Sequence, residues 1–438
     1  MDWYNDGPMA ERSKLAIVVA GGPAPGINSV IGAATIRACL SNVEVIGIQD
    51  GFRWIMEGDT SHVVPLTIHD TSRIHFRGGS YLGISRANPT KDPQHLAQAL
   101  ASLQKLGVNK LISIGGDDTC FSAHKLSEIS KGKLSVVHVP KTIDNDLDLP
   151  LDICTFGFQT ARHIGVEIVK NLMVDAKTTS RWYFVIAMGR KAGHLALGIG
   201  KAAGATLTLI PEEFGGTARL ATIVDILAGS VIKRLAHGRP DGVAVLAEGL
   251  AEAVPESDLA GLGHVERDAH DHIRIAEINL GDIVKAEVQK RLALLGIKST
   301  IVSKNIGYEL RCADPIPFDM EYTRDLGYLA ARYIIEGGSS ALISIQEGRF
   351  KPIPFAEIMS RDTGRMRVRM VDVESDRYKI ARTYMLRLKK EDFDDPHELL
   401  RLAATANMTP DAFRGAFGGQ VASEPRPVSM HAIAIEKA

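Results

Sequence analysis

The stretch LAIVVAGGPAPGIN, residues 15–28, decides what kind of fold this chain adopts. It opens with an apolar, β-branched run of strand length, and the glycine-rich turn GGPAPG follows directly. Glycine tolerates positive φ and lets the backbone approach a ligand closely, and Gly26 then opens a helical stretch. The segment therefore predicts a strand, a tight loop and a helix. The loop is either a phosphate cradle or an ordinary turn, because a glycine motif alone is weak evidence.

The same alternation of apolar strands and longer helical stretches recurs along the chain. It predicts parallel-rich sheets flanked by helices, an α/β fold. The predicted strands are residues 15–20, 43–48, 110–115, 134–140, 182–188, 205–210, 242–248 and 341–346. The predicted helices lie near 26–40, 93–106, 120–130, 157–175, 193–203, 217–237, 276–294 and 322–336. At 438 residues the chain exceeds the usual size of one core, so we expect two domains or one extended unit.

Composition excludes several classes of protein. With 45% hydrophobic and 24% charged residues, the chain has enough apolar surface to fold, and its net charge of -1 gives no field that attracts nucleic acid or membranes. The amino-terminal MDWYNDGPMAERSK lacks the pattern of a signal peptide, and no apolar run approaches membrane-spanning length. The four cysteines form no CxxC pair. We therefore expect a cytoplasmic protein with reduced thiols and no nucleic-acid or membrane partner.

Polar residues cluster where the predicted strands end. GGDDT (115–119) places Asp117 and Asp118 after one strand, where they either hold Mg²⁺ or cap the next helix. PKTIDND (140–146) follows another strand. Its Lys141 could neutralise charge on a transferring phosphoryl group, and its Asp144 could accept a proton from an attacking hydroxyl. Turn chemistry alone does not explain a lysine so close to an aspartate, so this motif favours function.

Other polar positions are less specific by themselves. Arg190, in MGRKAGH (188–194), either clamps phosphate or lies solvated on the surface. Glu248 ends an apolar strand, and a buried acid there needs either a ligand hydroxyl or a salt bridge. For YELR (308–311), Arg86 and Arg181 a structural role is the simpler interpretation. In open α/β sheets, ligands bind outside the carboxyl ends of the strands, so the strand-end loops are expected to converge.

Taken in order, GGPAPG, GGSYLGISR (78–86), GGDDT, PKTIDND, MGRKAGH, AEG and GYELR closely resemble the phosphofructokinase family. The resemblance spans residues from about 15 to 350. It implies two Rossmann-like lobes whose cleft holds fructose 6-phosphate, a phosphoryl donor and Mg²⁺. The implied ranges are 1–180 for the donor-binding lobe, 181–350 for the sugar-phosphate-binding lobe, and 351–438 for a C-terminal extension that packs on the lobes. Residues 251–272 are expected to form a surface insertion.

Carried over position by position, the resemblance assigns roles to individual residues. Asp144 is the expected base for the 1-hydroxyl proton, and Asp117 is the expected Mg²⁺ ligand. The expected catalytic set also contains Lys141, Asp118 and Arg190, and the expected donor-binding residues are Gly21, Arg86, Asp118 and Lys141. The expected sugar-phosphate-binding residues are Thr142, Ile143, Asp144, Asp146, Arg181, Met188, Gly189, Arg190, Glu248, Tyr308, Glu309, Leu310 and Arg311. Arg181 resembles the arginine that reaches in from a neighbouring subunit, which implies a homodimer or homotetramer.

Two positions distinguish the phosphoryl donor. ATP-using relatives typically have glycine where this chain has Asp118 and Lys141, and the pair resembles the pyrophosphate-dependent branch. Asp118 would lie where the α-phosphate of ATP lies, and like charges about 4 Å apart at an effective dielectric near 20 repel by roughly 4 kcal/mol. Lys141 restores positive charge near pyrophosphate. The alternatives are an ATP-dependent enzyme with the same acceptor and a non-catalytic regulatory subunit; a lipid or NAD kinase would lack TIDND and MGR in this order.

Overall fold

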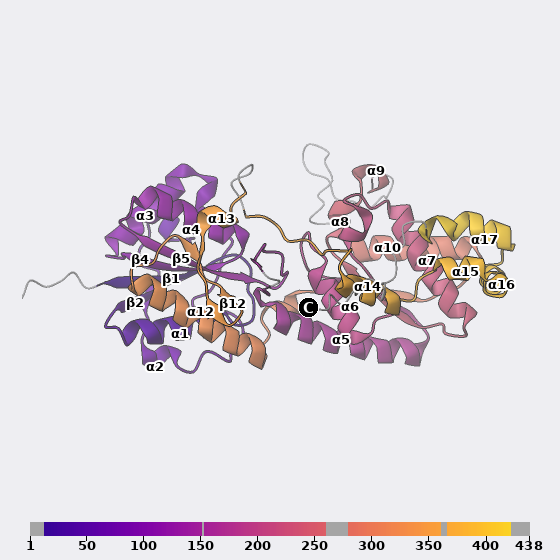
Figure 1. Cartoon of the computed structure of the whole chain (residues 1–438), viewed down its shortest axis with the longest axis horizontal. Helices are drawn as coiled ribbons and strands as arrows, with labels where there is room; N and C mark the ends of the chain where they lie inside the picture. The colour runs from indigo at the N-terminus through magenta and orange to yellow at the C-terminus, as the bar shows by residue number, and fades with distance from the viewer. Residues whose placement is uncertain (1–12, 151–152, 260–278, 361–365, 422–438) are drawn as a thin grey trace, which may run out of the picture. The chain divides into compact units, whose positions relative to one another are not determined.

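The computed structural model describes residues 13–150, 153–259, 279–360 and 366–421, which form two compact units (Figure 1). The first unit contains Met1–Ala161 and Tyr308–Arg369, and the second contains Arg162–Gly307 and Met370–Ala438. The boundaries between these units differ from the lobe boundaries at residues 180 and 350 that the sequence led us to expect. The YELR segment clusters with the first unit, because Arg311 and the helix that follows pack there. The insertion expected at 251–272 lies outside the described residues beyond 259.

The first unit is built on an eight-stranded sheet with the order β14-β11-β5-β4-β1-β2-β3, and β6 pairs with the end of β5. The central strands β2, β1, β4, β5 and β11 run parallel, and β3 and β14 are antiparallel edge strands. The strands are β1 Lys14–Val19, β2 Glu44–Ile48, β3 Val63–Pro65, β4 Lys110–Gly115, β5 Ser135–Thr142, β6 Phe156–Gly157, β11 Ala341–Leu342 and β14 Ile353–Pro354. Parallel pairing places the loops after β1, β4 and β5 at one edge of this sheet.

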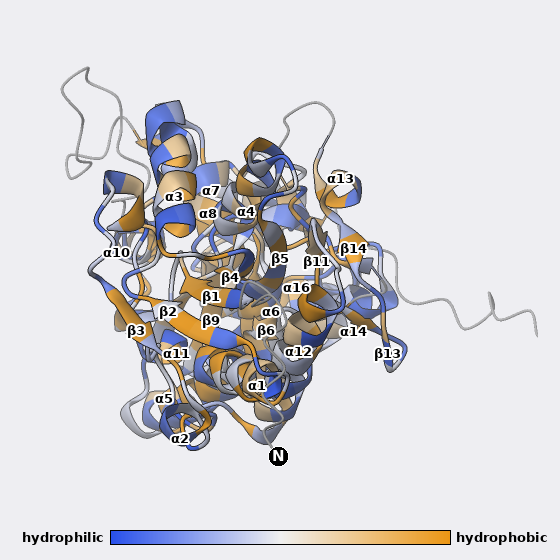
Figure 2. Ribbon diagram, turned by 90° about the vertical axis from the view of Figure 1, so that its left-hand side faces the viewer, coloured by the Kyte–Doolittle hydropathy of each residue, from blue (hydrophilic) through white to orange (hydrophobic). Residues whose placement is uncertain are grey.

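Successive side chains of β1 point to opposite faces of the sheet and are buried on both, which explains why helices cover both faces. Leu15, Ile17 and Val19 are buried with α1 (Ile27–Cys39) and α12 (Pro317–Ile335). Ala16 and Val18 are buried on the other face, with α3 (Pro93–Lys105), α4 (Asp117–Ser130) and α13 (Phe355–Ile358). Figure 1 shows these helices on opposite sides of the strands, and Figure 2 shows β1 and β2 as hydrophobic. A strand buried on both faces must be apolar at nearly every position, as LAIVVA is.

The second unit contains a four-stranded parallel sheet with the order β10-β7-β9-β8. Its strands are β7 Trp182–Ala187, β8 Leu207–Leu209, β9 Gly242–Ala247 and β10 Ile301–Ile306. Helix α6 packs on β8 and β9, and α10 packs on β7 and β10. The longer helices of this unit are α5 Phe158–Thr179, which begins in the first unit, α6 His194–Ala203, α7 Leu220–Ala236 and α10 Leu280–Leu294.

The C-terminal helices belong to the second unit and are attached through a buried ion pair. They are α14 Asp376–Tyr384, α15 Lys390–Asp394, α16 Pro396–Thr405 and α17 Pro410–Phe417. Arg387, between α14 and α15, donates to both carboxylate oxygens of Glu213 at 2.7 and 3.0 Å, and both side chains are buried. A paired charge avoids the large cost of an isolated buried ion, so this contact fixes where the extension docks.

The predicted fold class is confirmed: both sheets are parallel-rich and flanked by helices. The run 341–346 does not form one strand. Instead Ala341–Leu342 pairs with β5, and β12 (Ile345–Gln346) forms a hairpin with β13 (Arg349–Phe350). Strand β10 was not predicted, because its sequence IVSKNI is half polar and only its ends are fully buried. None of the helices in the described ranges combines the length and apolarity needed to cross a membrane.

Candidate active site

The loops after β1, β4 and β5 meet at one edge of the first unit's sheet. Residues of β1 pair with those of β4 as far as Val19 and Ile114, and β4 pairs with β5 as far as Gly115 and Pro140. The three motifs GGPAPG, GGDDT and PKTIDND therefore begin side by side. This convergence was expected from the sequence, and it brings together Gly21, Asp117 and Lys141.

Lys141 lies at the centre of this edge and is only 3% exposed. Its Nζ donates to the carbonyl oxygen of Gly22, in the loop after β1. Gly21 has a φ of 88°, which favours glycine, and a Cβ there would lie 3.5 Å from the ammonium nitrogen. The glycine loop is therefore shaped around the lysine: its backbone supplies an acceptor and leaves room for the charged group.

The environment of Lys141 lowers its pKa from the ordinary value of 10.5 to about 8. Burial is the main cause, and the Arg311 guanidinium adds to it. The carboxylates of Asp144, Asp117 and Asp146 act in the opposite direction, in that order of size. Because electrostatic coupling falls with distance, this balance places three acids and one further cation, Arg311, near the buried ammonium group. Such a cluster suits a highly charged ligand.

Asp117 and Asp118 are the first two residues of α4, and Gly116 occupies the N-cap position. Neither aspartate is therefore the cap, which was the structural alternative for this motif. Acidic side chains in a first helical turn interact favourably with the positive end of the helix dipole. Asp117 is half-buried and Asp118 is exposed, so both positions are accessible at the edge where Lys141 lies.

His138 is a buried residue of β5 that sequence analysis missed. Its Nε2 lies 3.0 Å from the carbonyl oxygen of Gly115, and its Nδ1 lies 3.3 Å from Ser113 Oγ. A carbonyl only accepts, so Nε2 holds a proton and donates it to the Gly115 oxygen. Burial, with Lys141 nearby, lowers the pKa of His138 to about 3. His138 thus fixes the end of β4 immediately before the GGDDT helix; the only signal in the sequence was a histidine inside the apolar run LSVVHVP.

The loop after Lys141 is held by its own backbone and by Thr155. The Asp144 amide donates to Thr142 Oγ1 at 3.0 Å. Thr155 Oγ1 donates to the Thr142 carbonyl at 2.7 Å, and the Thr155 amide donates to Asn145 Oδ1 at 3.1 Å. Asn145 has a φ of 56°, which turns the chain sharply between Asp144 and Asp146. The side chain of Ile143 is buried, so any ligand contact there would come from its backbone.

YELR and Arg86 lie beside the glycine loop of the first unit. A Cβ at Gly22 would collide with the Arg311 guanidinium, so this arginine lies directly on the GGPAPG backbone. Tyr308 is 78% exposed and its ring lies 5.6 Å from the Arg311 guanidinium carbon, whereas Leu310 is fully buried. Glu309 is exposed. Arg86 follows Ser85, whose carbonyl accepts from the Gly21 amide at 3.0 Å.

The MGR segment forms a separate cluster in the second unit, at the carboxyl end of β7. Glu248, which follows β9, accepts from the amides of Gly189 and Arg190 at 3.0 and 2.6 Å. Arg190 has a φ of 52° and an exposed side chain. The Met188 amide donates to the Ile306 carbonyl at 3.0 Å. Glu248 therefore orients this turn through these hydrogen bonds. Any contact of Glu248 with a ligand would be additional.

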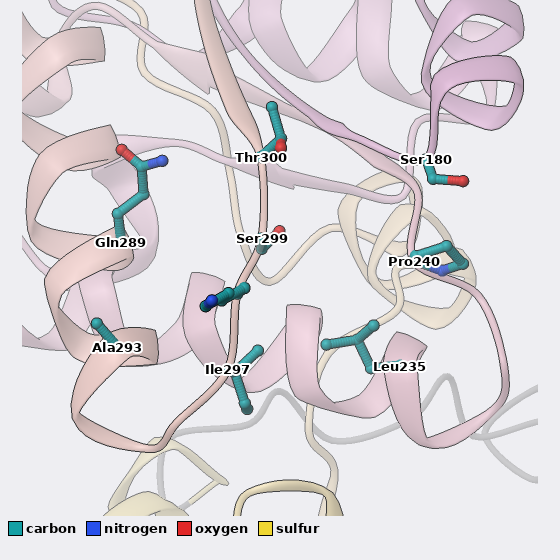
Figure 3. Close-up of a pocket in the computed structure, with 9 residues that line it drawn as sticks. Ser180, Leu235, Pro240, Gln289, Ala293, Ile297, Ser299 and Thr300 are labelled. Carbon is teal, nitrogen blue, oxygen red and sulfur yellow. The ribbon is translucent and has the colours of Figure 1, made fainter.

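Arg181 lies at the amino end of β7, at the edge of this sheet opposite to the MGR segment. It precedes β7 while Met188 follows it, and a strand rises about 3.3 Å per residue, so the two are roughly 23 Å apart. A cavity of about 350 Å³ opens at this edge, between Ser180, Pro240, Lys298 and Thr300 (Figure 3). The Nε atom of Arg181 is buried and has no hydrogen-bond partner in the described part of the chain. Arg181 cannot reach the MGR segment of its own chain.

Among the described residues, no three His, Cys, Asp or Glu side chains form a metal-binding group. Mg²⁺ in phosphoryl-transfer sites commonly takes one or two carboxylates plus phosphate oxygens. Asp117, at the amino end of α4 and coupled to Lys141, fits that mode of binding.

Comparisons with known proteins agree with the sequence motifs. Residues 14–334 match the profile of the family described as "Phosphofructokinase". A pyrophosphate–fructose 6-phosphate 1-phosphotransferase of Thermotoga maritima is 53% identical over 93% of this chain and 98% of its own. The protein of the same name from Naegleria fowleri is 48% identical over 91% of this chain and 94% of its own. The crystal structure of a pyrophosphate-dependent phosphofructokinase from Marinobacter aquaeolei matches with a TM-score of 0.65 at 15% identity, over 95% of this chain and 96% of its own.

The lowered pKa of Lys141 predicts a specific dependence of stability on pH. Between pH 8 and 10.5 the unfolded chain binds more protons than the folded one, so stability rises with pH across this window. Each unit of pKa difference is worth about 1.4 kcal/mol, so we expect a gain of about 3 kcal/mol relative to Lys141→Met. Denaturant unfolding of both proteins at several pH values measures it. The exposed Lys170→Met is the matched control, and a wild-type curve parallel to that of Lys141→Met would contradict the assignment.

Proposed function

The chain belongs to the phosphofructokinase family, and from that premise we propose that it is a pyrophosphate-dependent 6-phosphofructokinase. The proposed reaction transfers a phosphoryl group from diphosphate to the 1-hydroxyl of D-fructose 6-phosphate and gives fructose 1,6-bisphosphate and phosphate. It breaks one phosphoanhydride bond and forms one phosphoester. The reaction is expected to be reversible, since the two bonds differ little in hydrolysis free energy.

The observation that supports this donor is the buried ammonium group of Lys141 on the backbone of the glycine loop. A lysine at this position supplies positive charge where diphosphate, which has no nucleoside to hold it, must bind. Asp118, exposed in the first turn of α4, adds negative charge where the α-phosphate of ATP would lie. The two relatives that share about half of their residues with this chain have names that specify pyrophosphate.

In the proposed mechanism Asp144 accepts the proton of the 1-hydroxyl as that oxygen attacks the donor phosphorus. Lys141, beside Asp144, stabilises the charge that develops on the transferring group. Thr142 and Asp146, in the same loop, would position the sugar. Arg86 and Gly21 would hold the distal phosphate of the donor, because both lie on the loop after β1 or next to it.

The second unit supplies the remaining proposed contacts. Arg190, whose side chain is exposed, would clamp the phosphoryl group and the sugar phosphate. Met188, Gly189 and Glu248 are the proposed sugar contacts of this unit, and Tyr308 through Arg311 are further proposed sugar contacts. Mg²⁺, held by Asp117, would neutralise phosphate oxygens when bound.

We also infer a cytoplasmic homo-oligomer. The four cysteines are free thiols, which suits a reducing compartment. Arg181 lies too far from the MGR segment of its own chain to serve the same site, so the proposed role in sugar-phosphate binding requires a second copy.

The first prediction from the proposed function concerns the phosphoryl donor. Diphosphate should support phosphorylation of fructose 6-phosphate, and ATP should not, because Asp118 and Lys141 occupy the two discriminating positions. Steady-state kcat/KM with each donor, using the purified chain alone, is the measurement. Similar values for both donors would indicate the ATP-dependent enzyme, and no turnover with either would favour a regulatory subunit. Asp118→Gly is expected to admit ATP at most weakly, since the nucleoside needs its own pocket.

The second prediction concerns the base. Asp144→Ser should reduce kcat by about a hundredfold or more, because the 1-hydroxyl loses its proton acceptor, while binding of fructose 6-phosphate changes little. Kinetics and equilibrium binding measure the two effects separately. Thermal unfolding serves as the control for loop integrity. Near-normal kcat in the folded variant would remove Asp144 from this role.

The third prediction concerns a site shared between subunits. Arg181→Ala should weaken fructose 6-phosphate binding by the value of one charge-assisted contact, roughly 1.5–3 kcal/mol. A hybrid of Arg181→Ala and Asp144→Ser chains should regain activity, because a site with native Asp144 would receive Arg181 from its partner. Native mass spectrometry verifies that mixed oligomers form. Mixed oligomers no more active than the two parents would show that Arg181 does not cross between subunits.

A further inference from the structure

A short segment near the end of the first unit, residues 366–369, returns to the loop that contains Asp144. Val368 forms an isolated antiparallel bridge with Leu147. The Arg369 amide donates to the Asp146 carbonyl at 2.7 Å. The family match ends at residue 334, so this segment lies outside the region that defines the family.

The Arg369 side chain contacts Asn145, the residue between the two aspartates of TIDND. Its Nη2 donates to the Asn145 carbonyl at 3.1 Å and to Asn145 Oδ1 at 2.5 Å, and its Nε lies 3.2 Å from the same carbonyl. Asn145 is only 8% exposed, so these bonds form in a largely dry environment where hydrogen bonds are strong. One planar guanidinium thus holds both the backbone and the side chain of a single residue.

The conformation of Asn145 makes this contact important. Its φ of 56° is in the left-handed region, where asparagine is enriched among residues with a Cβ and where surrounding contacts hold it in place. Arg369 supplies such contacts, together with the Thr155 amide. Because Asn145 adjoins Asp144 directly, a change in its backbone angles would turn the Asp144 carboxylate away from its position.

We propose that Arg369 is a positioning residue for phosphoryl transfer: it holds Asn145 in its turn and thereby presents the carboxylate of Asp144 to the attacking hydroxyl. The inference rests on the proposed function, in which Asp144 is the base. In this proposal Arg369 acts through Asn145 and not on the reacting atoms. A misplacement of about 1 Å at a reacting group can cost on the order of a hundredfold in rate, so a remote guanidinium can control kcat.

The chain offers a matched control two residues away. Arg367 is half-exposed and pairs with Asp148 at 2.8 Å, a contact of the kind that contributes little to stability. Arg367 and Arg369 therefore share a segment and a charge but differ in what they hold. Lysine at 369 keeps the charge and the backbone bond to Asp146, but it lacks the planar fork that spans the two acceptors of Asn145.

The experiment compares Arg369→Lys, Arg369→Gln and Arg367→Gln in the full-length enzyme. We expect both changes at 369 to lower kcat by about 10- to 100-fold, with KM for each substrate changed by less than about threefold, because binding groups stay in place. Arg367→Gln should retain wild-type kcat. Hydrogen exchange of the peptide containing residues 143–148 should be faster in Arg369→Gln than in Arg367→Gln, with equal unfolding temperatures.

Three outcomes would overturn the proposal. These are a wild-type kcat in both 369 variants, an equal loss in the 367 and 369 variants, and a loss confined to KM. If Arg369→Gln does not fold, Arg369→Lys alone decides between these results, because lysine preserves the charge and the backbone hydrogen bond to Asp146. The exchange measurement needs no substrate. A chain that fails to use diphosphate but shows faster exchange at 143–148 in the 369 variants would refute the proposed function and leave the contact with Asn145 supported.

Discussion

A buried ammonium group imposes the main constraint on the first unit. Lys141 is nearly inaccessible to water, so its charge must be balanced by the protein. The Gly22 carbonyl accepts from it, and the acidic groups of two neighbouring strand ends surround it. This requirement fixes the path of the glycine loop, the start of α4 and the turn after β5 together. Three loops distant in sequence thus share one electrostatic cause, and the site is organised before any ligand arrives.

The fold was largely predictable because its strands are buried on both faces. LAIVVA is apolar at every position and KLISIG is polar only at Lys110 and Ser113, and such runs bounded by glycine indicate central parallel strands. The predictions of secondary structure failed at the edges of the sheets. Strand β10 is polar in its middle because it lies at the edge of its sheet, and 341–346 divides because its two halves pair with different partners. The docking of the C-terminal helices on the second unit was equally hard to predict, since it depends on Arg387 and Glu213, which are 174 residues apart.

The candidate site was predictable where strand ends determine position. Gly21, Asp117 and Asp144 follow strands and Lys141 lies at the carboxyl end of β5, and parallel pairing brings such residues to one edge. Residues that act through tertiary contacts had no such signal. His138 was one histidine in an apolar run, and Arg369 was one of several arginines in RMRVRM. Their functions depend on the acceptors that they meet, Gly115 and Asn145, and no local pattern specifies those acceptors.

The chain passes between the two units three times, after Ala161, Gly307 and Arg369. Neither unit is therefore a continuous piece of sequence, and this has a consequence for biosynthesis. While the ribosome makes the chain from its amino terminus, β5 exists long before its partner β11, and one face of the first sheet has α1 but lacks α12 until about residue 335 has emerged. The nascent first unit thus exposes apolar surface until α12 has been made. Its dependence on chaperones, and the tendency of truncated chains to aggregate, should follow from this order of synthesis.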